Sequence, residues 1–282
     1  MITAASNNRI KRLVQLNQKA KVRRTEDVFV VEGVKMFLEA PAEKIQEVYI
    51  AESLAAMCGI VENSSHTAAK ESTGTKDSAR MNECRKKLHS TGYEVVTDEL
   101  FKKISDTQTP QGILCVISQY HYRLEDLLAK ENAFLLVLED IQDPGNLGTI
   151  MRTGEGAGID GVIMSKNTVD LYNPKTIRST MGSIYRMPFV YVEEILPVMG
   201  ELKKAGVHTY AAHLDGKNSY TQENYCGKTA FLIGNEGNGL KEETAKAADT
   251  YIRIPMDGQV ESLNAAIAAA LLMYEGRRQR KG

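Results

Sequence analysis

Short apolar runs alternate with amphipathic stretches along the whole chain. In the first 120 residues, the runs that predict strands are Val28–Val31, Ile45–Ala51, Tyr93–Val96 and Gly112–Ser118. Apolar residues at helical spacing predict helices over Ser6–Lys19, Val34–Ala40, Ala79–Ser90 and Glu99–Ile104. The Ser-, Thr- and Lys-rich stretch Asn63–Asp77 is expected to be a loop or a weak helix. This alternation predicts a small α/β/α sandwich of about one hundred residues.

The second half of the chain opens with the continuously apolar run Phe134–Leu138, which is typical of a central parallel strand. Further strands are expected at Gly161–Ser165, Pro188–Val192, Val207–Ala211, Ala230–Ile233 and Tyr251–Met256. Helices are expected over Leu147–Gly156, Asn173–Ser183, Glu193–Ala205 and Glu261–Glu275, with another beginning at Lys241. Such alternation predicts an α/β domain with a doubly wound parallel sheet. We therefore expect a first domain over residues 1–120, a linker over 121–132 and a second domain over 133–282.

The composition is that of a globular protein with no secretory or membrane segment. Hydrophobic residues make up 43% and charged residues 25% of the chain, and no apolar run reaches the roughly 18 residues of a membrane span. The N-terminus lacks the apolar core of a signal peptide. The cysteines are scattered, with no CxxC pair, which argues against a zinc site or a disulfide framework. We therefore expect a cytoplasmic protein without a metal.

Positive charge gathers at the N-terminus although the net charge is only -1. The first 25 residues contain no acidic residue and carry the cations Arg9, Lys11, Arg12, Lys19, Lys21, Arg23 and Arg24. Such a cluster fits a local surface that binds the phosphates of a nucleic acid. It also fits an ordinary solvated helix face, and charge alone does not separate the two interpretations.

The loop after Phe134–Leu138 carries the first candidate constellation. Ligands of open parallel sheets bind beyond the carboxyl ends of the strands. Asn146 and Arg152 follow that strand end and lie about one and a half helical turns apart, so both could approach one ligand. Alternatively, Asn146 holds a turn and Arg152 is a surface cation, and the spacing alone favours this second interpretation.

The second constellation is the glycine-rich segment Gly234–Gly239, where the backbone can approach a ligand closely. No Gly-Lys-Ser/Thr follows, so it is not a phosphate-binding Walker loop. A glycine-rich turn would explain the glycines, but Glu236 is unusual in a plain turn.

The third constellation opens the last helix. Ser262 is a good N-cap residue, whereas Asn264 in the first turn is less easily explained because Asn is a poor helix former. Leu263, Ile267, Ala270, Leu271 and Tyr274 form an apolar stripe that could face the core or a partner subunit.

Other patterns do not support competing chemistry. Gly154–Gly158 follows a helix and lacks the GxGxxG spacing, which argues against a dinucleotide-binding oxidoreductase. The five histidines show no metal-ligand spacing, and no Ser/His/Asp set is recognisable.

Taken together, the three constellations resemble the motifs of the SpoU/TrmH branch of the SPOUT RNA methyltransferases. The matching segments are Asp143–Arg152, Phe231–Leu240, Ile254–Met256 with Ser262–Asn264, and Asn173–Arg186. The segments Val28–Gly33 and Thr109–Ile113 are similar to an L30e-type RNA-binding domain.

The resemblance implies a homodimer whose C-terminal α/β domain contains a deep trefoil knot, contrary to the usual avoidance of knots. It implies S-adenosylmethionine as the cofactor, with Gly234, Ile254 and Leu263 as main contacts and Leu232, Ile233 and Met256 nearby. It also implies methyl transfer to a ribose 2′-hydroxyl, with Arg152 acting on the hydroxyl. Asn146, Glu236, Ser262 and Asn264 would position the reacting groups.

The leading hypothesis is therefore an RNA 2′-O-methyltransferase acting on structured RNA, with 23S ribosomal RNA as the first candidate. Arg9, Lys11, Arg12, Lys21, Arg23 and Arg24 would supply RNA phosphate contacts. Transfer RNA is the alternative substrate. A non-catalytic RNA-binding or ribosome assembly factor is the alternative class of protein.

Overall fold

The computed structural model describes residues 1–61, 75–260 and 262–281 and divides the chain into two compact units. The first unit comprises Met1–Gln119 with Tyr172–Pro174, and the second comprises Tyr120–Leu171 with Lys175–Gly282. Most of the expected loop Asn63–Asp77 lies outside the described residues.

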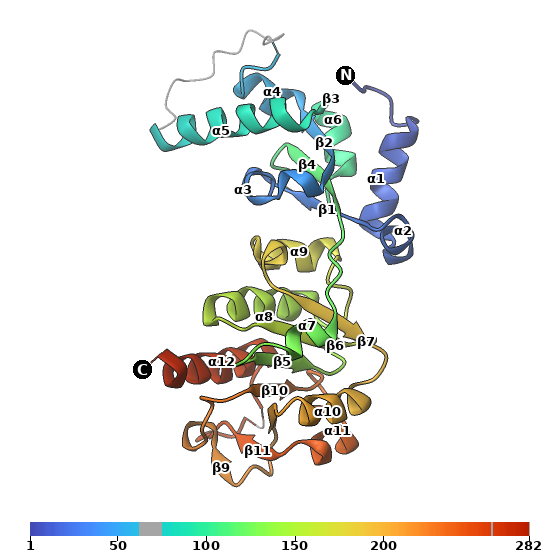
Figure 1. Ribbon diagram of the computed structural model, residues 1–282. Helices are drawn as coiled ribbons and strands as arrows, with labels where there is room; N and C mark the ends of the chain where they lie inside the picture. Colours follow the sequence, from blue (N-terminus) through green and yellow to red (C-terminus); the bar gives the residue numbers. More distant parts are fainter. Residues whose placement is uncertain (62–74, 261, 282) are drawn as a thin grey trace. The chain divides into compact units, whose positions relative to one another are not determined.

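The first unit is built on a four-stranded mixed sheet in the order β1-β4-β2-β3 (Figure 1). Its strands are β1 (Val28–Glu32), β2 (Ile45–Ala51), β3 (Glu94–Val96) and β4 (Ile113–Ser118). β4 pairs antiparallel with β1 and β2, and β2 pairs parallel with β3.

Helices connect these strands and provide part of the core of the first unit. They are α1 (Asn8–Gln18), α2 (Ala20–Glu26), α3 (Val34–Glu39), the 3-10 helix η1 (Ala42–Lys44), α4 (Glu52–Met57), α5 (Thr75–Thr91) and α6 (Asp98–Ile104). The buried stripe Ile10, Leu13 and Leu16 of α1 packs in one cluster with strand and α6 side chains. The side chain of Asn7, and not that of Ser6, caps α1 by accepting from Arg9 N at 2.9 Å.

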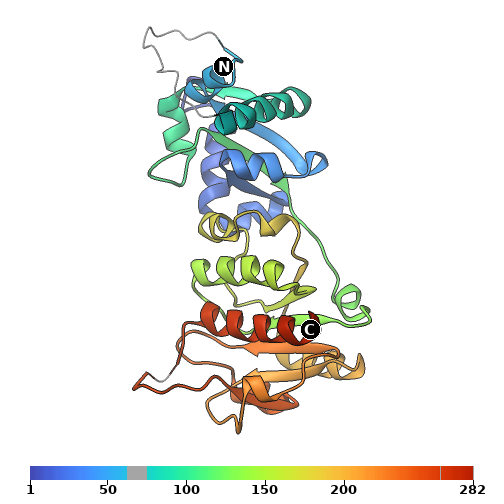
Figure 2. The same cartoon turned by 90° about the vertical axis from the view of Figure 1, so that its left-hand side faces the viewer.

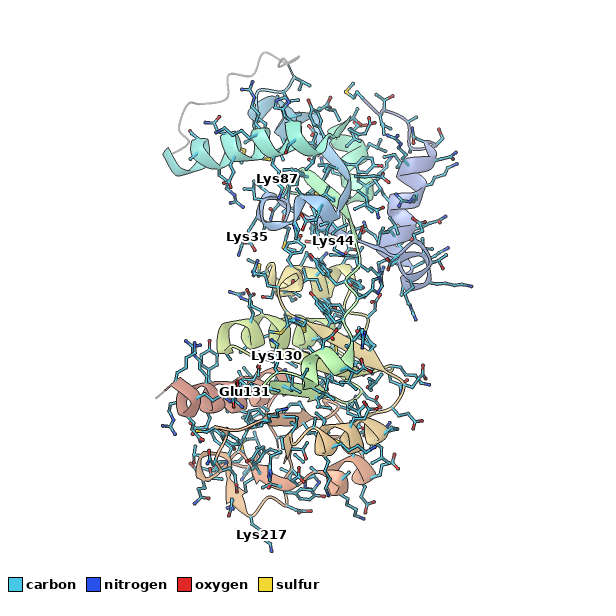
Figure 3. The ribbon with its side chains drawn as sticks, in the orientation of Figure 1. Lys35, Lys44, Lys87, Lys130, Glu131 and Lys217 are labelled. Atoms are coloured by element: carbon cyan, nitrogen blue, oxygen red, sulfur yellow. The ribbon has the colours of Figure 1, made fainter. Side chains whose placement is uncertain are left out.

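Two lysine side chains of this unit, Lys44 and Lys87, donate to backbone carbonyls, and Figure 3 labels both lysines. Lys87 Nζ donates to the carbonyl oxygens of Leu38 and Ala40 at the end of α3. Lys44 Nζ donates to the carbonyl of Gln119 at 3.2 Å. These three bonds place a cation beside backbone carbonyls at the end of a helix or strand.

The second unit contains a seven-stranded sheet in the order β7-β6-β5-β10-β8-β11-β9, with parallel pairing throughout. The strands are β5 (Phe134–Leu138), β6 (Gly161–Ser165), β7 (Phe189–Val192), β8 (His208–Ala212), β9 (Asn218–Ser219), β10 (Thr229–Ile233) and β11 (Thr250–Arg253). Every residue of β5, β6 and β10 is buried, as expected for parallel strands covered on both faces. The predicted parallel α/β architecture is confirmed.

The helices of this unit are α7 (Leu124–Leu128), α8 (Pro144–Ala157), α9 (Pro174–Thr180), η2 (Ser183–Tyr185), α10 (Ile195–Lys204), η3 (Tyr220–Gln222), α11 (Glu242–Ala247) and α12 (Ala265–Lys281). Figure 2 shows α12 lying beside α8, and the two helices are in contact. None of the described helices combines the length and apolar character needed to cross a bilayer.

Several expected boundaries differ from those observed. The expected linker contains α7, whose Leu127 is 2% exposed within the core of the second unit. α8 begins three residues earlier than expected because Asp143 caps it and Pro144 occupies its first turn. α9 ends at Thr180 because Met181 and Gly182 both have positive φ angles.

Candidate active site

A cavity of about 640 Å³ lies where β8, β10 and β11 end and α12 begins. This volume is typical of small-molecule sites, roughly 300–1,000 Å³. Its lining comes from four segments, which are Ala212–Leu214, Ile233–Leu240, Ile252–Asp257 and residues of 262–268. The second and third sequence constellations therefore meet in one place.

The glycine-rich loop forms the closed wall of this cavity. Asn235 and Gly239 exchange two backbone hydrogen bonds of 3.0 and 2.9 Å. A Cβ atom on Gly234 would lie 2.0 Å from the carbonyl carbon of Gly239, so only glycine fits there. Asn235 Oδ1 also accepts from the amides of Gly237 and Asn238. Gly234 therefore lets the loop close on its own backbone at Gly239 and Leu240, and the closed loop lines the cavity.

Glu236 ties this loop to the beginning of α8. Its carboxylate accepts from the backbone amides of Gln142 and Asp143, each at 3.0 Å, and from Asn146 Nδ2 at 3.0 Å. Burial of the Glu236 carboxylate would raise its pKa, but these three hydrogen bonds outweigh burial and hold the pKa below its usual value. Glu236 is therefore an anion at neutral pH.

The side chain of Asn146 connects Glu236 to the beginning of α12. Because Glu236 is an acceptor, the amide of Asn146 directs Nδ2 toward it and Oδ1 away from it. Asn146 Oδ1 then accepts from Asn264 Nδ2 at 2.9 Å. Asn264 Oδ1 in turn accepts from the amides of Ala266 and Ile267 in the first turn of α12. A directed chain of hydrogen bonds therefore joins the β10 loop, α8 and α12.

The hydrogen bonds of Asn264 correct the expected cap of the last helix. Asn264, and not Ser262, is the residue whose side chain caps α12. Ser262 instead lines the cavity. The poor helix propensity of Asn264 is no disadvantage at a capping position.

The structure separates the other expected site residues into two groups. Gly234, Ile254, Leu263, Ile233 and Met256 line the cavity with Glu236 and Ser262. Leu232 is fully buried in the core cluster of the second unit and does not line the cavity. Arg152 is exposed on α8, and it has no hydrogen-bond or ion-pair partner among the residues that the structure describes.

Two acidic residues after β5 were not anticipated. Glu139 is 2% exposed and accepts from Lys241 N at 2.8 Å and Thr244 Oγ1 at 2.6 Å, which fixes the beginning of α11. Asp140 has a φ of 58°, and its carbonyl accepts from Asn235 Nδ2 at 2.8 Å. The signal in the sequence is the Glu139-Asp140 pair directly after a buried strand, where polar groups meet the sheet edge.

The expected RNA-binding cations of the first unit differ in availability. Arg9 pairs with Glu94 at 2.6 Å, and Arg12 pairs with both Glu26 and Glu47 at 2.6 Å. Arg23 is 3% exposed and donates to the carbonyls of Leu16 and Asn17, so it closes the junction of α1 and α2. The remaining three cations, Lys11, Lys21 and Arg24, are exposed.

Sequence comparison identifies the second unit. Residues 133–274 match the SpoU rRNA Methylase family. The chain belongs to the SpoU rRNA methylase family. Residues 7–115 match an MRM3-like substrate binding domain, so the chain pairs a SpoU catalytic domain with a substrate-binding domain.

Known proteins of this family resemble the chain over most of its length. The 23S rRNA (guanosine(2553)-2'-O)-methyltransferase RlmP of Bacillus subtilis (strain 168) is 36% identical over 183 residues, which cover 65% of this chain and 71% of RlmP. A crystal structure of an RNA 2'-O ribose methyltransferase has a TM-score of 0.78 and 27% identity, with 100% and 99% of the two chains covered. The AdoMet-bound rRNA methyltransferase of Sinorhizobium meliloti has a TM-score of 0.78 and 27% identity, covering 98% and 97%.

The SpoU assignment makes this chain an S-adenosylmethionine-dependent RNA 2′-O-ribose methyltransferase. The cavity fits that cofactor, because apolar side chains such as Ile233, Ile254 and Leu263 line it together with polar side chains and the backbone of Gly234. Side-chain clusters suited to a metal ion are absent from the described part of the chain.

Proposed function

We propose that this enzyme methylates a ribose 2′-hydroxyl in 23S ribosomal RNA. The hydrogen-bond chain Glu236–Asn146–Asn264 carries the proposal, because it ties two catalytic candidates, Asn146 and Asn264, to Glu236, which lines the cofactor cavity. The likeness to RlmP, named for a 23S rRNA site, supports ribosomal RNA over transfer RNA. For such a substrate we propose a cytoplasmic location.

The residues at the cavity would act by orientation and charge. S-Adenosylmethionine supplies the methyl group as a positively charged sulfonium. Glu236 holds Asn146, and Asn146 and Asn264 together hold the ribose hydroxyl in line with the cofactor cavity. Ser262 lines the same cavity and would bound the ribose. Arg152 stays protonated, so we assign it to clamp the adjacent phosphate and stabilise the developing alkoxide, while the proton of the hydroxyl passes to solvent water.

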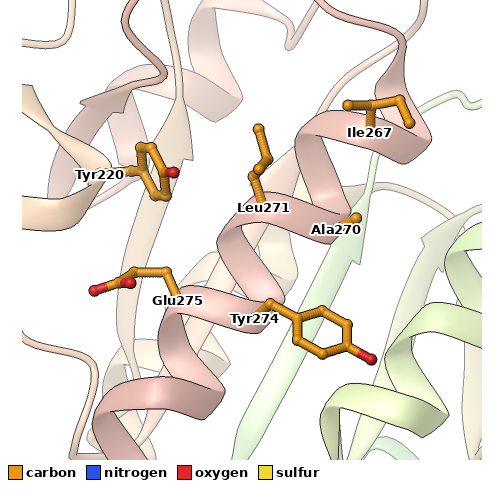
Figure 4. Close-up of a pocket in the computed structure, with 6 residues that line it drawn as sticks. All are labelled: Tyr220, Ile267, Ala270, Leu271, Tyr274 and Glu275. Carbon is orange, nitrogen blue, oxygen red and sulfur yellow. The ribbon is translucent and has the colours of Figure 1, made fainter.

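We further propose that the chain acts as a homodimer through α12 and α8. The core-facing side of α12 is formed by Ala265, Ala266, Ala269, Leu272, Met273 and Gly276. The expected stripe faces the other way, and Ile267 and Tyr274 are 52% and 49% exposed. Figure 4 shows Ile267, Leu271 and Tyr274 along α12, with Tyr220 facing the helix across a hollow of about 410 Å³. A second copy is the proposed occupant of this apolar surface.

The proposed interface includes the face of α8 that carries Arg152. Thr149, Arg152 and Gly156 are all exposed on α8. Tyr274 links this face to α12, because a Cβ atom on Gly156 would lie 3.2 Å from the Tyr274 hydroxyl. Dimerisation would therefore place Arg152 beside the partner copy rather than in open solvent.

The C-terminal segment leading into α12 would be threaded as a trefoil knot.

For RNA contact by the first unit, we propose Lys11, Lys21 and Arg24 as primary phosphate ligands. Arg9 and Arg12 would join them only by exchanging their carboxylate partners for phosphates. Arg23 supports the fold instead. Charge reversal at Lys11, Lys21 and Arg24 should weaken RNA binding and flatten its dependence on salt concentration.

The deciding experiment measures transfer of labelled methyl groups to 23S rRNA fragments and to transfer RNA, followed by mapping of 2′-O-methyl positions. Site-specific labelling of 23S rRNA supports the proposal. If only transfer RNA is labelled, transfer RNA and not 23S rRNA is the substrate. RNA binding without any methyl transfer would instead favour the assembly factor.

A further inference from the structure

His213 stands in the wall of the cofactor cavity, and neither the sequence motifs nor the comparisons give it a role. It directly follows β8, and its backbone amide donates to the Ile252 carbonyl at 2.9 Å. The sheet order places β8 and β11 on the side of β10 that faces away from β5. His213 therefore lies on the opposite side of the cavity from the loop after β5, which leads into Asn146.

The turn after His213 holds its imidazole in one place. Gly216 N donates to the His213 carbonyl at 3.1 Å, and a Cβ atom on Gly216 would lie 2.6 Å from the carbonyl carbon of Ile252. The imidazole packs against the Tyr251 ring with centroids 4.8 Å apart and an interplanar angle of 36°. A ring fixed by its own turn and by an aromatic neighbour can serve as a pre-organised ligand group.

One hydrogen bond selects the tautomer of this ring. Asp215 N donates to His213 Nδ1 at 3.2 Å, closer than the Asp215 carboxylate oxygen at 3.7 Å from the same nitrogen, and this shorter bond uses the Nδ1 lone pair. The neutral imidazole then carries its proton on Nε2. Within the described part of the chain, Nε2 has no protein acceptor. His213 therefore has one unused donor in a residue that lines the cavity.

We propose that His213 binds the adenosine part of S-adenosylmethionine, with Nε2–H donating to a nitrogen or oxygen acceptor of the nucleoside. This inference rests on the proposed function, since the reacting methyl must lie on the side of Asn146 and Glu236. The nucleoside then occupies the opposite side, where Ala212, Leu214 and Ile252, at the ends of β8 and β11, supply apolar surface. Leu214 is 70% exposed there, and a bound adenine would cover it.

Calorimetric titration with S-adenosylmethionine and with 5′-methylthioadenosine tests this role, because the second ligand keeps the nucleoside but lacks the amino-acid end. His213→Phe keeps a ring against Tyr251 and removes the donor. We expect it to weaken both ligands by roughly 3- to 10-fold, the effect of one lost hydrogen bond. His213→Gln retains an N–H donor at similar reach and should recover most of the affinity.

His208→Phe is the matched control. His208 begins the same strand, packs against Tyr210 with centroids 4.6 Å apart, and bonds to Thr250 Oγ1 at 2.9 Å, but it does not line the cavity. The His208→Phe variant should bind both ligands with the affinity of the wild-type protein.

The outcomes separate this inference from the proposed function. Wild-type affinity of His213→Phe for both ligands overturns the role of His213 and leaves the enzyme assignment intact. Weakened binding of S-adenosylmethionine alone also overturns it, since the contact would then be to the amino-acid end. If His213→Phe misfolds, the affinities of His213→Gln and His213→Ala for the two ligands are compared instead. Affinity lost equally in both variants would contradict the role of the N–H donor. A wild-type protein that binds neither ligand refutes both proposals.

Discussion

Asn146 Nδ2 donates to the carboxylate of Glu236 at 3.0 Å, although 90 residues of chain separate them. The same carboxylate accepts from the Gln142 and Asp143 amides, so three donors from one short segment converge on one anion. Glu236 therefore fixes the position of the segment that leads into α8 and the orientation of Asn146. A neutral amide at position 236 could not accept three such bonds.

Glu236→Gln should lower the rate of methyl transfer about 100-fold, because the amide would turn an N–H toward other donors and displace Asn146. Cofactor affinity should change much less, since Gly234 and the apolar lining remain. Single-turnover kinetics and calorimetry measure the two effects separately. Glu242→Gln is the control, because Glu242 is exposed and bonds only to Lys246 among the described residues. Equal loss in both variants would refute the role of Glu236.

The depressed pKa of Glu236 predicts how this network responds to acid. A carboxylate whose pKa is lower in the folded than in the unfolded state stabilises the fold above the unfolded pKa of about 4.3. That contribution is lost as the pH falls through the folded-state pKa. The difference in free energy of unfolding between wild type and Glu236→Gln should therefore be constant above about pH 5 and shrink at lower pH. Urea denaturation at several pH values measures it, and a difference that grows in acid would contradict the network.

Gly148 allows α8 to approach α9 closely. A Cβ atom there would lie 2.4 Å from Ser179 Cβ and 2.6 Å from the Thr176 carbonyl oxygen. Gly148→Ala should destabilise the protein by about 1–3 kcal/mol through overpacking. Gly200→Ala is the matched control, because Gly200 lies within α10 with no atom within 4 Å of the added Cβ. That variant should gain about 0.5–1 kcal/mol from helix propensity. Thermal unfolding compares them, and equal shifts would rule out the close approach.

The sequence predicted those features that local patterns determine. The apolar run at Phe134–Leu138 is the fully buried β5, and the glycine segment and the last helix do meet at one cavity. The features that the sequence did not predict depend on contacts between residues far apart in the chain. Ser262 and Asn264 are both good capping residues, and only the partner Asn146 shows why Asn264 takes that role. Charge counting could not reveal that Arg23 would be buried against the Leu16 carbonyl.

Arg152 lies outside the hydrogen-bond chain, and a regular helix explains why. Six residues of α-helix turn the side chain about 120° away from Asn146. Arg152→Ala should therefore leave cofactor affinity unchanged but lower methyl transfer by roughly 100- to 1,000-fold, as for loss of a group that stabilises developing charge. Arg152→Lys should recover only part of the rate, because it keeps the charge but loses the planar fork. Arg123→Ala, at an exposed pair with Glu125, is the control. Near-normal methyl incorporation by Arg152→Ala would refute the assignment.

The exposed stripe of α12 predicts a dimer that single charges can disrupt. Ile267→Glu would place two carboxylates in a symmetric apolar contact, so the dimer dissociation constant should rise at least about tenfold. Light scattering over a concentration series measures that change. Leu196→Glu on α10 is the control, because Leu196 is also exposed, at 40%, but lies outside the proposed interface. If Arg152 works only when covered by the partner, activity of Ile267→Glu should recover as protein concentration rises, by mass action. A monomeric wild-type protein with full activity would exclude this arrangement.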